Sequence, residues 1–161
     1  MDFASKTCGC PVIVTEDWDL VERELGDTVY FTSRLLMFFH IPILKTRAEA
    51  KALAALRAAG LNQAESGEIL TRDGLFAGKL LVAVAEGSIG ISARTVSLKG
   101  TRVISKVVSG TRKDLSAGVS ELLSYVRTKA GTHPKSVYFW NIDCLRCGEE
   151  NVFKTVIFAE I

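Results

Sequence analysis

One pattern of strands and helices occurs twice in the 161-residue chain, and this repetition constrains the fold more than any other feature. In each copy an apolar strand is followed by a helix and then by two further strands. Both helices are preceded by a threonine with an acidic residue three positions later, Thr46 with Glu49 and Thr111 with Asp114, which is the pattern of a capping box. Both helices end at an Ala-Gly pair, where glycine suits the left-handed position after the last turn.

The repetition predicts an α+β fold made of tandem βαββ units, residues 35–87 and residues 101–161. We expect these units to form an antiparallel sheet with the two helices packed on one of its faces. Residues 1–34 form an N-terminal extension, in which we expect a short strand and a short helix. The length suits one domain better than two, so we expect residues 1–161 to form a single domain.

Composition narrows the class of protein further. Apolar residues make up 48% of the chain and charged residues 24%, which excludes a disordered or low-complexity protein. The chain contains no apolar run of the roughly 18 residues that a membrane-spanning helix needs. The first residues also lack the basic and apolar regions of a signal peptide. We therefore expect a cytoplasmic protein with no membrane partner.

The predicted strands are unusual because both of their faces are apolar, as in residues 80–85 and 137–142. Helices on one side cover only one face of an antiparallel sheet, and the other face is normally polar. A second cover is therefore needed, and the candidates are the N-terminal segment, a ligand or a second subunit. A homodimer that uses this face only as an interface is one alternative reading.

Four cysteines form two close pairs, Cys8 with Cys10 and Cys144 with Cys147. In a reducing compartment paired cysteines are more often metal ligands than disulfides. The Cys-x-x-Cys-Gly spacing is typical of a zinc knuckle, and Cys-Gly-Cys places two sulfurs on one face of an extended segment. We predict a closed, structural four-cysteine zinc site that ties the N-terminus to the last hairpin. Iron is the alternative metal; a redox-active Cys144–Cys147 pair and unliganded thiols are the alternatives without a metal.

The second βαββ unit has a Gly-Thr pair before its helix, an aromatic-rich strand at residues 136–142 and a final strand that ends the chain. With the tandem layout, residues 35–161 resemble the superfamily of gyrase-inhibitor-like effector-binding domains and SOUL haem-binding proteins. The resemblance is one of layout. It implies a groove in which two helices flank a central sheet and which binds hydrophobic or cationic small molecules. The cysteine pairs and residues 1–34 are not part of the family pattern.

The resemblance also implies aromatic residues and an acid in that groove. By strand position the counterparts are Trp140, Tyr138, Tyr125 and Glu160, with Trp140 and Tyr125 as walls and Glu160 as a polar anchor. His40 lies in a predicted apolar strand, where it is either a hydrogen-bonded core residue or a ligand or general base. The sequence therefore predicts a small-molecule-binding domain, and we expect binding rather than catalysis.

Two other functions are alternatives. A buried Glu160 beside aromatic rings would have a raised pKa and could serve a hydrolase as a general acid or base in the same groove. Residues 94–113 carry six basic residues and no acid, which with a zinc knuckle could form a nucleic-acid-binding surface. This stretch has no aromatic residue for base stacking and the net charge of the chain is only +2, so a nucleic-acid partner is not favoured.

Overall fold

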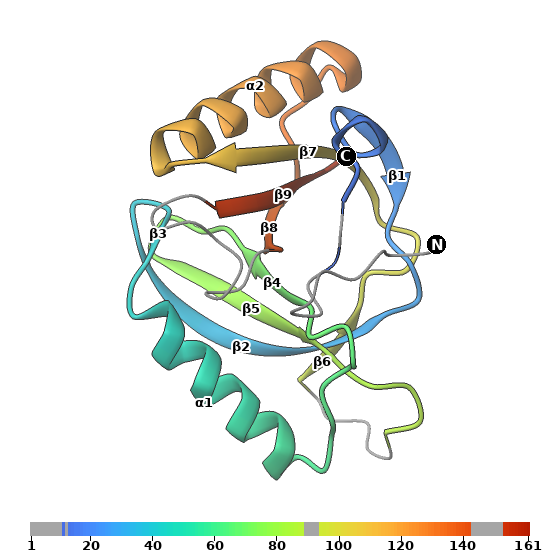
Figure 1. Cartoon of the computed structure of the whole chain (residues 1–161), viewed down its shortest axis with the longest axis vertical. Helices are drawn as coiled ribbons and strands as arrows, with labels where there is room; N and C mark the ends of the chain where they lie inside the picture. The colour runs from blue at the N-terminus through green and yellow to red at the C-terminus, as the bar shows by residue number, and fades with distance from the viewer. Residues whose placement is uncertain (1–10, 12, 89–93, 143–152) are drawn as a thin grey trace. The chain divides into compact units, whose positions relative to one another are not determined.

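A computed structural model describes residue 11 and residues 13–88, 94–142 and 153–161 of the chain. The chain divides into two compact units (Figure 1). Unit 1 comprises residues 1–24 and 101–161, and unit 2 comprises residues 25–100. Unit 1 is therefore assembled from both ends of the chain, whereas unit 2 is one continuous segment.

Unit 2 contains a five-stranded antiparallel sheet and one helix. Its elements are β2 (Val29–Phe38), β3 (Ile41–Pro42), α1 (Lys45–Ala58), β4 (Ile69–Arg72), β5 (Ala77–Ala83) and β6 (Thr95–Ser97). The strands lie in the order β4-β5-β2-β3, and β6 also pairs with β2. The helix packs Ala52 and Leu56 against Phe31, Leu35 and Leu80, which are all buried. This contact covers one face of the unit 2 sheet.

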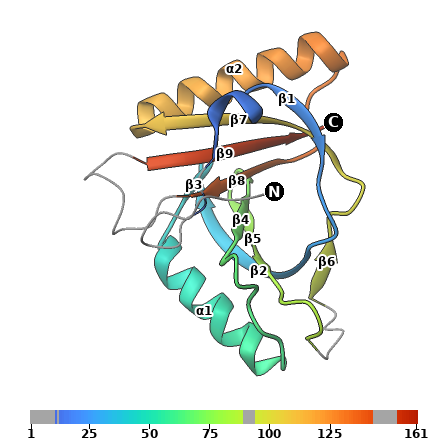
Figure 2. The ribbon, with the colours of Figure 1, turned by 45° about the vertical axis from the view of Figure 1, so that its right-hand side comes forward.

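Unit 1 contains a four-stranded antiparallel sheet and the longer helix (Figure 2). Its elements are the 3-10 helix η1 (Thr15–Asp17), β1 (Val21–Glu24), β7 (Arg102–Gly110), α2 (Arg112–Ala130), β8 (Val137–Asn141) and β9 (Phe153–Glu160). The strands lie in the order β1-β7-β9-β8. Leu122 and Val126 of α2 are buried against Ile104 and Ile157 of the sheet.

The expectation of an α+β fold with tandem βαββ units is confirmed. In unit 2, β5 pairs with both β2 and β4, and in unit 1, β9 pairs in the same way with both β7 and β8. Helix α1 follows β2 and the short β3, helix α2 follows β7, and each helix covers one face of its unit's sheet. Unit 2 begins its first strand at Val29, earlier than the sequence pattern predicts.

The predicted N-terminal helix is wrong. Residues 15–17 form a single 3-10 turn, and the chain then becomes strand β1. The physical reason is long-range pairing, because β1 adds to the edge of β7 with Val21 opposite Ser105. The Ser105 hydroxyl donates to the Trp18 carbonyl oxygen at 2.7 Å, which holds the preceding turn in place.

Of the two predicted capping boxes, only the second is present. The Thr111 backbone N–H and hydroxyl both donate to the Asp114 carboxylate, at 2.7 and 2.8 Å. In the first helix Thr46 lies inside the helix, and the N-cap is Leu44, in a left-handed conformation with φ of 51° and no side-chain cap. Neither helix of the described residues is long and apolar enough to cross a membrane.

Candidate functional site

One face of the unit 1 sheet carries an aromatic–carboxylate cluster, which we define as Trp18, Tyr138, Trp140, Phe158 and Glu160. The strand residues of the cluster alternate with those that pack against α2, so they lie on the opposite face of the sheet. The ring centroid of Trp18 lies 6.1 Å from that of Trp140 and 6.2 Å from that of Phe158. The N-terminal segment therefore covers part of the sheet face opposite α2, which the strands with two apolar faces required.

The polar part of the cluster is a tyrosine–carboxylate pair. The Tyr138 hydroxyl donates a hydrogen bond to Glu160 Oε2 at 3.2 Å. Tyr138 is only 4% exposed, and Glu160 is half-buried. A buried phenol that donates to a carboxylate fixes the position of that carboxylate beside the rings. This arrangement offers an acceptor oxygen next to a flat apolar surface.

A guanidinium completes the surroundings of Trp18. The Arg23 guanidinium carbon lies 3.6 Å from the centroid of the Trp18 ring, and Nη2 donates to the Asp17 carbonyl oxygen at 2.7 Å. Its Nε is buried without a hydrogen-bond partner among the residues that the structure describes. Burial lowers the pKa of Arg23, although the nearby Asp17 charge opposes this. The indole of Trp18 thus contacts a cation as well as two aromatic rings.

The structure separates Tyr125 from the other aromatic residues that the sequence assigns to the groove. Tyr138, Trp140 and Glu160 are brought together on one face of the unit 1 sheet, whereas Tyr125 belongs to α2 and packs on the opposite face. The helical period explains this, because Tyr125 lies three residues after the buried Leu122 and therefore on the same side of α2. Tyr125 instead lies with its ring centroid 5.8 Å from the Lys129 ammonium.

His40 lies in unit 2, outside any strand. It occupies the turn between β2 and β3 with a positive φ of 66°, and its side chain is 58% exposed, so it is not a core residue. Its Nδ1 lies 2.7 Å from Asp73 Oδ2, which leaves Nε2 pointing away from the carboxylate. Phe39 lies in the same turn as His40, and Phe76 lies in the turn between β4 and β5 that contains Asp73. Their exposed rings have centroids 5.5 Å apart.

A second tyrosine–carboxylate pair lies in unit 2, and the sequence patterns did not indicate it. The Tyr30 hydroxyl donates to Glu68 Oε1 at 2.7 Å. Burial raises the pKa of Glu68, and the hydrogen bond from Tyr30 opposes this. Burial also raises the pKa of Tyr30, as does the Glu68 charge. The only sequence signal is an acid directly before an apolar strand, which has many commoner explanations.

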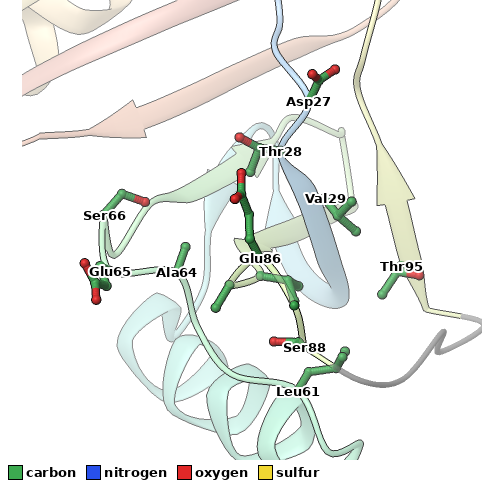
Figure 3. Close-up of a pocket in the computed structure, with 13 residues that line it drawn as sticks. Asp27, Thr28, Val29, Leu61, Ala64, Glu65, Ser66, Glu86, Ser88 and Thr95 are labelled. Carbon is green, nitrogen blue, oxygen red and sulfur yellow. The ribbon is translucent and has the colours of Figure 1, made fainter. Parts of the chain in front are cut away.

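Beside this pair lies an acidic pocket of about 760 Å³ in unit 2 (Figure 3). Its lining includes three acids, Asp27, Glu65 and Glu86, with aliphatic and hydroxyl side chains between them. In Figure 3 the Glu86 side chain extends toward Thr28. The part of the lining that the structure describes includes no lysine, arginine or histidine, although Asp27 Oδ1 lies 2.9 Å from the Lys99 ammonium. The pocket is chemically suited to a cation with an apolar part.

Three of the six basic residues at positions 94–113 form ion pairs within the described part of the chain. Lys106 is buried with its ammonium 3.3 Å from Asp19 and 3.1 Å from Glu121, and Arg102 pairs with Glu22. Lys99 pairs with Asp27, as described above. Intramolecular ion pairs therefore neutralise part of the charge that a nucleic acid would need.

All four cysteines lie outside the described residues, so the structure says nothing of their arrangement. Among the residues it does describe, no three histidine, cysteine or acidic side chains come together as a metal ion would require. The chain next to the cysteine pairs is described in part. The Lys154 ammonium donates to the Ile13 carbonyl oxygen at 2.8 Å, and the Ile142 backbone N–H donates to the Lys154 carbonyl oxygen at 3.0 Å.

Comparison with known proteins places the chain in a family. Residues 1–161 match the model of a family described as Bacterial hydrolase. The chain belongs to this family. No curated protein matches it. The match covers every residue of the chain, so both units fall within what the bacterial hydrolase family shares.

A solved structure shows a related fold. It is a chain from Staphylococcus aureus MU50, provisionally described as a bacterial transcription regulation protein. The TM-score is 0.51 at 16% sequence identity, and the match covers 89% of this chain and 97% of that chain. At this identity the likeness shows the fold alone. Neither match confirms the resemblance to gyrase-inhibitor-like and SOUL proteins.

Proposed function

We propose that this member of the bacterial hydrolase family binds a small molecule at the aromatic–carboxylate cluster of unit 1 and hydrolyses it there. The observation that carries the proposal is the hydrogen bond from the Tyr138 hydroxyl to Glu160 Oε2, 3.2 Å long and beside three aromatic rings. The layout resemblance to effector-binding domains supports the same kind of ligand, which is hydrophobic or cationic. The family description supports the reaction class.

The residues of the cluster divide the work between binding and proton transfer. The half-buried rings of Trp140 and Trp18 provide the apolar surface for the ligand, and the buried Phe158 supports Trp18 from within the sheet. Glu160 is the general base, and Tyr138 holds its carboxylate in position. Glu160 accepts a proton as the water oxygen attacks the electrophilic carbon of the substrate. The leaving group then departs with that proton, and the carboxylate is restored.

Binding is tested with a defined hydrophobic cation, tetraphenylphosphonium, followed by quenching of tryptophan fluorescence. Glu160→Gln should weaken binding about tenfold, since it removes the charge that faces the cation, and Trp140→Ala should abolish it. Glu24→Gln removes an exposed carboxylate from the same unit and should leave the affinity unchanged. Equal affinity in the wild type and Glu160→Gln would remove Glu160 from the site.

Hydrolysis is tested separately with p-nitrophenyl acetate. Glu160→Gln should lower the rate at least tenfold and Tyr138→Phe less, because Tyr138 acts only through Glu160. Glu24→Gln is again the control. If Glu160→Gln weakens tetraphenylphosphonium binding but leaves the ester rate unchanged, the cluster belongs to a binding domain without hydrolase activity.

The acidic pocket of unit 2 is a second candidate position for a cationic ligand. It is favoured by its three carboxylates and by the absence of a basic residue from its described lining. The same tetraphenylphosphonium titration separates the two candidates. Loss of affinity in Glu86→Gln, with no change in Glu160→Gln, would move the ligand from unit 1 to this pocket.

We also propose that Cys8, Cys10, Cys144 and Cys147 hold one structural zinc ion, in the reducing environment of the cytoplasm. Their spacing supports this, and so does the hydrogen bond between Lys154 and Ile13, which joins the segments that follow Cys147 and Cys10. A closed four-thiolate site would contribute to folding and leave no open position for catalysis.

Elemental analysis of the purified full-length chain tests the metal. About one zinc per chain is expected from four thiolate ligands. Cys8→Ser and Cys144→Ser should both lose it together with thermal stability. Iron in place of zinc would indicate a redox-active metal site. A metal-free wild type would leave the cysteines as free or catalytic thiols.

A further inference from the structure

Three basic residues lie side by side across neighbouring strands of unit 2. Arg34 of β2 is directly opposite Lys79 of β5, and Lys79 is directly opposite Arg72 of β4. Residues paired in this way project from the same face of a sheet, with their Cβ atoms close together. Like charges that lie directly opposite each other destabilise an antiparallel sheet. The pairing of Arg34 with Lys79 therefore works against the stability of unit 2.

Among the described residues, no acid supplies a counter-charge to Arg34 or Lys79. Both are exposed, and neither forms an ion pair with any residue that the structure describes. Four of the acids in unit 2 already have polar partners in the described part of the chain. The pairs are Asp27 with Lys99, Glu49 with Lys45, Glu68 with Tyr30 and Asp73 with His40.

A cavity of about 400 Å³ opens beside these two cations. Its described lining consists of Thr32, Ser33, Arg34, Lys79 and Arg94, which bring three cations, two hydroxyls and no carboxylate. The guanidinium carbon of Arg94 lies 4.7 Å from the centroid of the buried Phe31 ring. The Thr32 hydroxyl donates to the Arg94 carbonyl oxygen at 2.9 Å. These two contacts hold Arg94 at the edge of β2, facing the same space.

We propose that this cavity is a binding site for the phosphoryl group of a small molecule. Two guanidinium groups and one ammonium reach it from three separate segments, which suits the several oxygens of a tetrahedral dianion. A bound phosphoryl group would remove the repulsion between Arg34 and Lys79. All of its described residues belong to unit 2, so the proposal does not rest on the aromatic–carboxylate cluster of unit 1.

The test is a titration of the ¹⁵N-labelled full-length chain with inorganic phosphate, at an ionic strength held constant with chloride. Saturable shifts are expected for the backbone amides of Ser33, Arg34 and Lys79. Arg34→Gln and Lys79→Gln should each weaken phosphate binding about tenfold, since each removes one charge-assisted contact. The same titration with acetate should give clearly weaker binding, because acetate carries one charge.

Matched controls distinguish phosphate binding at this cavity from a general effect of the charge of the protein. Lys51→Gln and Arg57→Gln remove exposed cations from α1 of the same unit and should leave phosphate binding unchanged. Lys79→Gln should keep or raise the melting temperature, because it relieves repulsion, so its loss of binding would not reflect unfolding. Shifts with phosphate no larger than with chloride would overturn the proposal, as would equal binding of acetate or equal loss in the α1 controls.

Discussion

The Glu68 carboxyl is buried against Tyr30, and because of this burial it makes the stability of the folded chain depend on pH. Its pKa in the folded chain is raised above 4.5 by burial. Between 4.5 and the folded pKa, the folded state keeps a proton that the unfolded state releases. The contribution to stability is therefore complete below pH 4.5 and is lost as the pH rises through the folded pKa.

Glu68→Gln should reduce this loss of stability with rising pH, because glutamine does not titrate. The measurement is the free energy of unfolding in urea at several pH values on both sides of 4.5. Glu65→Gln, an exposed neighbour in the same segment, is the control and should keep the wild-type profile. A profile for Glu68→Gln that falls as steeply as the wild type would show that the Glu68 carboxyl is not the group responsible.

Gly118 permits close contact between α2 and the unit 1 sheet. A Cβ added at this position would overlap the Val108 side chain, which is stiff and buried. Gly118→Ala gains about 1 kcal/mol of helix propensity but loses about 1–3 kcal/mol through overpacking, so a net loss of about 1 kcal/mol is expected. Urea denaturation measures it, with the exposed Ser116→Ala as control. A more stable Gly118→Ala variant would show that Val108 moves aside at little cost.

At the scale of elements, the two helices begin differently although their sequences suggest the same start. Thr111 donates to Asp114 at the start of α2, whereas Thr46 lies inside α1 behind an uncapped Leu44. Thr111→Ala should therefore cost about 1 kcal/mol of unfolding free energy, and Thr46→Ala should cost much less. Chemical denaturation of the two variants gives the comparison directly. Equal losses would mean that Thr46 caps its helix after all.

The Asp114 carboxylate adds a pH dependence to the same capping box. The hydrogen bonds from Thr111 lower the pKa of Asp114 below 3.8. A lowered folded pKa means that the stabilisation is present above 3.8 and is lost as the pH falls through the folded value. The difference in stability between the wild type and Asp114→Asn should therefore shrink in acid. A difference that stays constant down to acid pH would exclude this carboxylate as its source.

Sequence patterns predicted correctly those elements that depend on residues close together in the sequence. The repeated spacing of strand, helix and strands identified both βαββ units, and the Thr111 and Gly131 signals placed both ends of α2. The patterns failed where distant residues decide. The predicted N-terminal helix becomes β1 because the edge of β7, far along the chain, is there to pair with.

The candidate site shows the same division. Strand alternation puts Tyr138 and Trp140 on one face, because a period of two holds along any regular strand. Only the layout resemblance assigns Glu160 to the same groove, and the pairing of β8 with β9 is what brings it to Tyr138. Trp18 and the Tyr30–Glu68 pair could not be found in this way. Their contacts join residues of different elements, Trp18 with Phe158 and Tyr30 with Glu68. Only the completed fold brings them together.

For the whole chain, the main consequence of the topology is that unit 1 needs both ends of the sequence. Strand β1 pairs with β7, Trp18 packs against Trp140 and Phe158, and Lys154 binds the Ile13 carbonyl oxygen. Unit 2, by contrast, is formed by residues 25–100 without a break. The N-terminal segment is thus a structural part of unit 1 rather than an appendage.

A chain that starts at residue 25 should therefore lose the cooperative unfolding of unit 1, because β7 loses its edge partner and the rings lose Trp18. Trp18→Ala is the milder form of the same change. Trp18 is half-buried, so we expect a loss of about 2 kcal/mol, below the roughly 3–5 kcal/mol of a fully buried ring. Trp18→Phe should restore part of this, since it keeps a ring against Phe158. Urea unfolding followed by amide resonances of α2 and of α1 reports each unit separately. Amides of α2 that keep wild-type stability in the shortened chain would show that residues 101–161 fold without the N-terminal segment.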